Sequence, residues 1–133
     1  MIMLRTKSVY SPIEPKEDGL RILVTRFRGR GMRSSRYHVW MANLGPSERL
    51  LRDARAEKIT QAQFAAAYRK ELFVDGVIDS RNRTIKNHGQ KFTLRLIKRL
   101  AQHQKVTLMC HCDEDYEGCH RHVLKRLILS KKI

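Results

Sequence analysis

The sequence predicts an α/β fold: one small domain with a mainly parallel sheet flanked by helices. Two apolar stretches carry this prediction, at 20–26 and 106–110, and each is typical of an interior strand covered on both faces. An amphipathic stretch at 91–103 precedes the second strand, and a helix is expected from Cys119 onward. The chain thus ends in the order strand, helix, strand, helix, which implies a right-handed crossover and parallel strands.

Length and composition favour one soluble domain. The 133 residues suffice for one real core and are too few for two, so we treat 1–133 as a single domain. An apolar content of 41% with few glycines and prolines excludes a disordered or collagen-like chain. No apolar run approaches the roughly 18 residues that a membrane span needs, so no membrane partner is expected. The first residues lack the features of a secretory signal, and we therefore expect a cytoplasmic protein with reduced thiols.

The other elements follow from local signals. In chain order we expect a strand at 3–10, a proline-containing loop at 12–18, a helical turn at 38–44, and helices at 47–56 and 60–72. Ser47 is the expected N-cap of the first helix, and Thr60 with Gln63 has the spacing of a capping box. The helix at 91–103 is expected to bury its apolar residues Phe92, Leu96, Ile97 and Leu100.

A long polar connection is expected at 74–90. It carries the basic residues Arg81, Arg83, Lys86 and His88. The sequence leaves open whether this segment is a lid or an ordinary loop.

The charge balance indicates an anionic partner. The 28 Lys and Arg residues against 13 acids leave a formal charge of +15. Nucleic acid is the commonest partner of such a charge, followed by phosphorylated small molecules and acidic membrane surfaces. The alternative, a basic surface that serves solubility or ion pairing, fits less well because the acids are too few to pair with the bases.

A cationic loop follows the strand at 20–26. We expect four of its arginines to bind anions: Arg26, Arg28, Arg30 and Arg33. Gly29 and Gly31 allow backbone N–H groups to approach an anion while guanidinium groups donate to its oxygens. The pattern matches neither the P-loop nor the dinucleotide fingerprint, and a solvated loop is the alternative.

The turn after the strand at 106–110 holds all three cysteines of the chain. If the strand continues to Cys112, Cys110 and Cys112 should point to one side of it and His111 to the other. Cys119, followed by His120 and Arg121, begins a helix, which is a setting that lowers the pKa of a thiol. Four nearby acids oppose that effect: Asp113, Glu114, Asp115 and Glu117.

Other interpretations of this turn remain open. A zinc site could be drawn from the three cysteines and one histidine, although the spacing C-x-C-x6-C-H matches no usual zinc motif. A bridge between Cys112 and Cys119 is sterically conceivable. Cys110 can also be a small buried hydrophobic residue. The cysteine turn and the arginine loop both leave the carboxyl ends of parallel strands, so they could face one cleft.

Several stretches together resemble the domain of unknown function 488 family. They are DGLRILVTRF at 18–27, Arg30-Gly31, Trp40, LGPS at 44–47, Phe64, YRKEL at 68–72, VTLMC at 106–110 and CHRHVL at 119–124. The resemblance runs from about Arg5 to Leu127 and implies a small α/β domain of bacteria and archaea without an established activity. Where members usually show Asp-Arg-Leu-Trp-Pro-Arg-Gly, this chain has TRFRGRG at 25–31, without the acid or the Trp-Pro pair. The Cys-His-Arg triplet resembles the branch of the family that carries this motif.

These observations predict a protein that binds nucleic acid or a nucleotide-like anion in a cleft between the two loops. As an enzyme it would use Cys119 as the nucleophile or redox thiol, His120 as its base and Arg121 as the anion clamp. We expect no cofactor and no metal. The alternative is a non-catalytic nucleic-acid-binding module in which the cysteine turn is structural or binds zinc.

Overall fold

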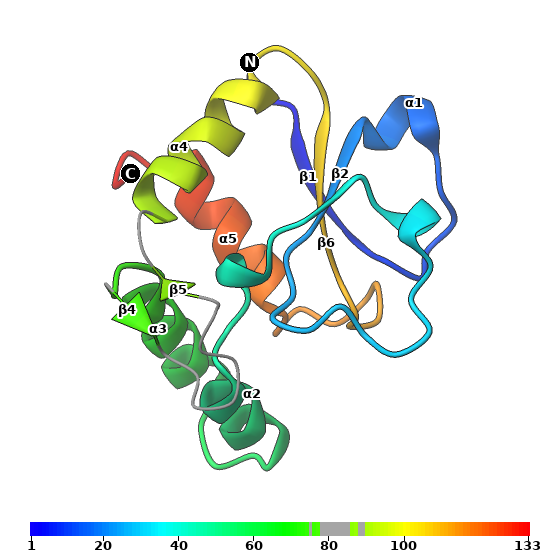
Figure 1. The fold of residues 1–133 in the computed structure, drawn as a ribbon. Coiled ribbons are helices and arrows are strands. Elements are labelled where there is room, and N and C mark those ends of the chain that lie inside the picture. Colours follow the sequence, from blue (N-terminus) through cyan, green and yellow to red (C-terminus); the bar gives the residue numbers. More distant parts are fainter. Residues whose placement is uncertain (75, 78–85, 88–89) are drawn as a thin grey trace.

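The computed structural model describes residues 1–74, 76–77, 86–87 and 90–133. Within them, the main sheet consists of β1 (Leu4–Ser8), β2 (Leu20–Leu23), β3 (Val39–Trp40) and β6 (Val106–Cys110). The helices are α1 (Pro15–Asp18), α2 (Glu48–Arg55), α3 (Gln61–Leu72), α4 (Gln90–Ala101) and α5 (His120–Leu129), as Figure 1 shows. A separate antiparallel pair is formed by β4 (Gly76–Val77) and β5 (Lys86–Asn87). The predicted α/β fold is confirmed.

The main sheet is entirely parallel and has the strand order β1-β6-β2-β3. β6 lies between β1 and β2, with Ser8 opposite Cys110 and Leu23 opposite Met109. All five residues of β6 are buried, as expected of a central strand with both faces covered. Because the strands are parallel, the segments that follow β1, β2 and β6 all leave the sheet at one edge.

The two faces of the sheet have different covers. Ile22 and Leu108 point into the main apolar core beneath the helices, whereas Leu23 and Met109 belong to a smaller cluster with Met32. Side chains alternate along a strand, so neighbouring residues of β6 necessarily serve opposite faces. The segment between β2 and β3, which carries the arginines, therefore covers the face opposite the main core.

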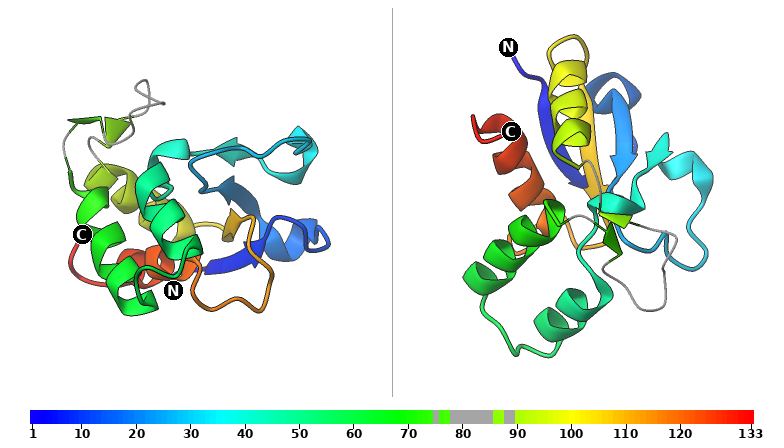
Figure 2. Two further views of the ribbon diagram at one scale, coloured as in Figure 1. Left: turned by 90° about the horizontal axis from the view of Figure 1, so that it is seen from below. Right: turned by 60° about the vertical axis from the view of Figure 1, so that its left-hand side comes forward.

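The helices that cover the main core form one layer, and α5, the helix that follows the cysteine turn, lies next to the sheet. α5 packs on β1 and β6, α4 and α3 both pack on α5, and α2 packs on α3. Figure 2 shows α2 and α3 side by side, extending from the sheet. The predicted N-cap at Ser47 and the capping box of Thr60 and Gln63 are both present. No helix in the described part of the chain is long and apolar enough to cross a membrane.

Some expected elements differ in the structure. The proline-containing loop includes the short helix α1, which begins with Pro15 in its first turn. The second strand ends at Leu23, short of the expected 26. The turn at 38–44 contains β3 before a single turn of 3₁₀ helix at Ala42–Leu44.

The buried face of α4 was predicted wrongly in part. Ile97 is buried as expected, but Phe92 and Leu96 are 69% and 54% exposed. The buried stripe consists instead of Gln90, Leu94, Ile97 and Ala101. The sequence of this helix contains two apolar stripes at helical spacing, and only packing against β6 and α5 distinguishes them.

Candidate functional site

Three cysteine side chains meet where β6 ends and α5 begins. Cys110, the last residue of β6, points to the same face as Leu108, and Cys112 follows in the bend just beyond the strand. Cys119 is the N-cap residue of α5, and its side chain lies against Cys110. The three Sγ atoms lie within 4.8 Å of one another. We call Cys110, Cys112 and Cys119 the thiol cluster.

All three cysteines of the thiol cluster are free thiols. The Cys119 thiol donates a hydrogen bond to Cys110 Sγ over 2.7 Å. Cys110 and Cys119 are 0% and 2% exposed, whereas Cys112 is only half-buried. Cys112 is thus the sulfur of the cluster that solvent or a ligand reaches most easily.

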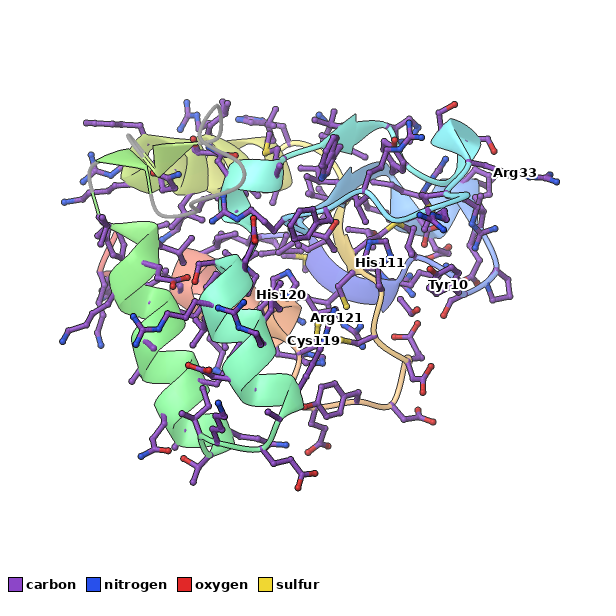
Figure 3. All side chains as sticks on the ribbon, turned by 60° about the horizontal axis from the view of Figure 1, so that its bottom comes forward. Tyr10, Arg33, His111, Cys119, His120 and Arg121 are labelled. Atoms are coloured by element: carbon purple, nitrogen blue, oxygen red, sulfur yellow. The ribbon has the colours of Figure 1, made fainter. Side chains whose placement is uncertain are left out.

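Arg121 is fully buried beside the cluster (Figure 3). Its Nη1 donates to Cys110 Sγ over 2.7 Å, and its Nη2 donates to the carbonyl oxygens of Asp113 and Glu114 over 3.2 and 2.8 Å. The guanidinium therefore fixes the shape of the cysteine turn and places a positive charge against the sulfurs. Its pKa is raised from the ordinary value: burial opposes this, but the contacts with Cys110 outweigh it.

Glu114 ties the turn to the first strand. Its Oε1 accepts hydrogen bonds from the Ser8 N–H over 3.2 Å and from Ser11 Oγ over 2.6 Å. Its Oε2 lies 3.8 Å from Arg121 Nη2. Among the four acids near the cysteines, Glu114 thus forms an ion pair with the Arg121 guanidinium, which in turn contacts the sulfurs.

His120 is buried behind Cys119. Its Nε2 donates to the carbonyl oxygen of Val24 over 2.6 Å, and its Nδ1 lies 3.7 Å from Cys119 Sγ. Burial lowers the pKa of His120 to about 4, so the imidazole is neutral at neutral pH. With the Nε2 proton engaged by Val24, Nδ1 is the acceptor that faces the Cys119 thiol.

The thiol cluster favours one thiolate over three. Hydrogen bonds from Cys110 and Cys119 are the largest cause that lowers the pKa of Cys112 far below the ordinary 9.0. The pKa of Cys119 is raised, chiefly through its hydrogen bonds with Cys110 and Cys112. Because the three sulfurs are close together, ionisation of one of them opposes the formation of a second charge.

A pocket of about 170 Å³ adjoins the thiol cluster. Cys112, Cys119 and His120 line it, together with residues of α2, α3 and their connection. Its other side chains include apolar Leu51, Ile59 and Phe64 and polar Arg55, Gln61 and Tyr116. Gly118 also lines it, and a Cβ there would lie 2.7 Å from Tyr116 Oη. The pocket therefore combines an apolar wall, one exposed arginine and two sulfurs.

The arginine loop does not line this pocket. Arg28, Arg30 and Arg33 are exposed, and Arg30 and Arg33 border a separate hollow with Tyr10. Arg26 differs from them: it is 1% exposed, and its guanidinium donates to the carbonyl oxygens of Gly45 and Pro46. Arg26 is thus placed to hold the chain before α2, and not among the exposed loop arginines as we expected.

The two loops are neighbours on opposite faces of the sheet. His111 Nε2 donates to the carbonyl oxygen of Phe27 over 3.1 Å, and His111 Cε1 lies 2.8 Å from where a Cβ of Gly29 would stand. His111 thus reaches the arginine loop while Cys112 and Cys119 line the pocket beside the helices, although the strand ends at Cys110 and does not continue to Cys112. The arginine loop and the thiol cluster border separate hollows, where we expected a single cleft.

Sequence reasoning missed the helical side of the pocket. Arg55, Gln61 and Tyr116 were not singled out, although the capping box at Thr60 marks the start of the helix that supplies Gln61. Of the basic residues in the connection at 74–90, Arg81, Arg83 and His88 lie outside the described residues, and only the backbone of Lys86 lies within them.

The fold and the site define a small parallel α/β domain with a buried thiol cluster at the carboxyl edge of its sheet. Residues 4–132 match the family model described as the active DUF488-N3 subclade. The chain therefore belongs to the DUF488 family, as the resemblance indicated. No curated protein and no solved structure matches the chain.

Proposed function

We propose that this protein is a thiol-dependent enzyme that acts on an anionic, nucleotide-like ligand. The observation that carries the proposal is the contact between the thiol cluster and the pocket: Cys112 and Cys119 line it, and Cys112 is the more exposed of the two. A nucleophile has to reach its substrate, and a pocket of about 170 Å³ beside the sulfur supplies that access.

The residues of the turn then take distinct roles. Cys112 is the nucleophile: its thiolate forms a bond to an electrophilic centre of the bound ligand, and the bond from that centre to its leaving group breaks, with the electron pair departing on the leaving group. Arg121, fully buried among loop carbonyls, donates to Cys110 Sγ, favours the Cys112 anion through its positive charge and holds the turn, where the sequence suggested an anion clamp. His120, whose neutral ring places Nδ1 3.7 Å from Cys119 Sγ, packs against the Cys119 side chain, where the sequence suggested a general base. Cys119, which the sequence favoured as nucleophile, becomes a hydrogen-bond donor.

Charge and shape support an anionic ligand with an apolar part. Arg55 lines the pocket, and Arg49 and Arg52 of the same helix are also exposed. Phe64, Leu51 and Ile59 offer an apolar wall suited to a nucleobase. The formal charge of +15 favours the approach of nucleotides and nucleic acid over neutral ligands. Reduced thiols are stable in the cytoplasm, which is the location we propose.

The second candidate is a non-catalytic nucleic-acid-binding module with a structural cysteine turn. The exposed Arg28, Arg30 and Arg33 favour it because they lie apart from the pocket and could bind phosphates without the thiols. In this case Cys112 has no need to react.

Alkylation separates the two candidates. We expect iodoacetamide to modify Cys112 selectively near neutral pH, and a nucleoside monophosphate to slow the reaction by occupying the pocket. Peptide mass spectrometry identifies the modified residue, and Cys112→Ser is the matched variant that should resist labelling. Three inert thiols in the folded protein would favour the binding module.

A further inference from the structure

We propose that the thiol cluster is also a binding site for one thiophilic d10 cation, with Zn²⁺ as the representative ion, and that this bound state and the reactive state exclude each other. The inference rests on the proposed function only for its second half. The cation site itself follows from the positions of the sulfurs and their neighbours.

The sulfurs are close enough to share one ion. A tetrahedral Zn²⁺ has Zn–S bonds of about 2.3 Å, which places its sulfur ligands about 3.8 Å apart. The three Sγ atoms of the cluster lie within 4.8 Å of one another, and Cys119 Sγ and Cys110 Sγ are 2.7 Å apart. Small rotations of the three side chains would therefore bring all the sulfurs to one centre.

The surroundings of the sulfurs are those of a metal-thiolate group. The Arg121 guanidinium donates to Cys110 Sγ and is held by the carbonyl oxygens of Asp113 and Glu114. It would offset the negative charge that remains when three thiolates bind one divalent ion. Such hydrogen bonds from outside the ligand set orient ligands and tune their affinity.

The donor set selects the kind of cation. Three thiolates suit soft or borderline ions such as Zn²⁺ and Cu⁺, whereas Mg²⁺ and Ca²⁺ require oxygen ligands. The carboxylate of Glu114, which contacts Arg121, is engaged by Ser8 and Ser11 and is not part of the ligand group formed by the three cysteines. Cys112 and Cys119 line the pocket, so an ion can enter and a fourth ligand can come from that side.

Occupancy would have a direct chemical consequence. A cation bound to Cys112 uses the same sulfur electron pair that attacks a substrate, so the metal-bound thiolate cannot act as a nucleophile. The thiol cluster would then be a site that thiophilic metal switches off and that a chelator restores.

Cobalt spectroscopy tests the site itself. We expect the reduced full chain to bind about one Co²⁺ with a thiolate-to-metal charge-transfer band, which Zn²⁺ then removes. The band should be lost in Cys112→Ser. Cys112 is only half-buried, so this variant should fold, and circular dichroism verifies that it does. His103→Ala, which alters an exposed histidine on a distant turn, should leave it unchanged. No band in the folded wild type, or an unchanged band in Cys112→Ser, would overturn the site.

Alkylation under metal separates this inference from the proposed function. Saturating Zn²⁺ should slow iodoacetamide labelling of Cys112 about tenfold or more, because the free thiolate is the reacting form. A chelator should restore the rate. If Cys112 reacts selectively without metal but Zn²⁺ gives no protection, the inference fails and the proposed function stands. If the cobalt band forms while the metal-free thiols are inert, the site stands and the proposed function fails.

Discussion

The guanidinium of Arg121 donates to Cys110 Sγ over 2.7 Å, with both side chains fully buried. A buried positive charge is costly unless its donors are paired. Here a sulfur and the carbonyl oxygens of Asp113 and Glu114 pair the two terminal nitrogens, while the buried Nε has no hydrogen-bond partner among the described residues. The thiol cluster and the backbone of the cysteine turn are therefore held by the same planar group.

Arg121→Lys should destabilise the fold although it keeps the charge. A lysine cannot reproduce the fork that spans a sulfur and two carbonyl oxygens, so we expect a loss of about 1–3 kcal/mol in the free energy of unfolding. Urea denaturation measures it. Arg126→Lys, an exposed residue of the same helix, is the control and should change stability by less than about 0.5 kcal/mol. Equal midpoints for the two variants would contradict the structural role of Arg121.

Replacement of the cysteines should reveal their unequal burial. Cys110→Ser shortens a fully buried acceptor at the end of β6 and weakens its hydrogen bonds from Arg121 and Cys119, at a cost of about 1–3 kcal/mol. Cys112→Ser, in the half-buried turn, should cost less than about 0.5 kcal/mol. Thermal unfolding of chelator-treated protein makes the comparison. Similar losses in both variants would argue against a distinct role for Cys112.

Gly118 controls the width of the pocket. A Cβ at this position would lie 2.7 Å from Tyr116 Oη and 2.9 Å from Gln61 Nε2, so Gly118→Ala must displace both side chains. We expect labelling of Cys112 by a bulky aromatic disulfide to slow more than labelling by iodoacetamide, with stability within about 1 kcal/mol of wild type. Equal slowing of both reagents would show that the substitution changes the thiol and not the access to it.

Acid should weaken the attachment of α1 to the sheet. Burial alone raises the pKa of Asp18, but the Glu14 N–H and the Lys7 ammonium, 2.9 and 3.0 Å from its carboxylate, outweigh burial and lower the pKa below the ordinary 3.8. A lowered pKa in the folded state contributes stability above the unfolded value, and that stability is lost as pH falls through the folded value.

We therefore expect Asp18→Asn to be less stable than wild type at pH 7 and the difference to shrink below about pH 4. Urea midpoints across this range give the result, with the exposed Asp115→Asn as the control. A difference that is constant with pH would exclude ionisation of Asp18 as its source.

The arginine loop predicts a salt dependence. If six or more phosphates are engaged, affinity for an oligonucleotide should fall by orders of magnitude between about 50 and 200 mM salt. Exchange of Arg28 and Arg30 for Ala should reduce the slope by about two while stability changes by at most about 1 kcal/mol. A shallow dependence of affinity on salt concentration in the wild type would exclude nucleic acid as the partner and favour a small anionic ligand.

The sequence predicted what depends on local spacing. Strand alternation placed Cys110 and Cys112 together and His111 apart, and the capping signals at Ser47 and Thr60 were correct. Relations set by tertiary packing could not be predicted in this way. Phe92 was expected in the core and is exposed, because the choice between two apolar stripes is made by contacts with β6 and α5.

The candidate site shows the same limit. Its cysteines could be found because they lie within ten residues of one another in the sequence. Arg55 and Phe64 join them only through the packing of α2 on α3 and of α3 on α5. Arg26 was grouped with Arg28 on composition, yet a buried hydrogen bond to Gly45 separates the two.

The position of β6 between β1 and β2 has a consequence for folding. Leu4 pairs with Val106 and Leu20 pairs with the same residue from the other side, so β1 has no partner strand until residues 106–110 are available, and β2 has only the two-residue β3. Contacts this distant along the chain slow folding, because a large loop must close before the central pairing is gained. During synthesis on the ribosome, β1 therefore emerges as an unpaired strand and β2 with one edge open, and chaperones that shield such edges should raise the yield of native protein.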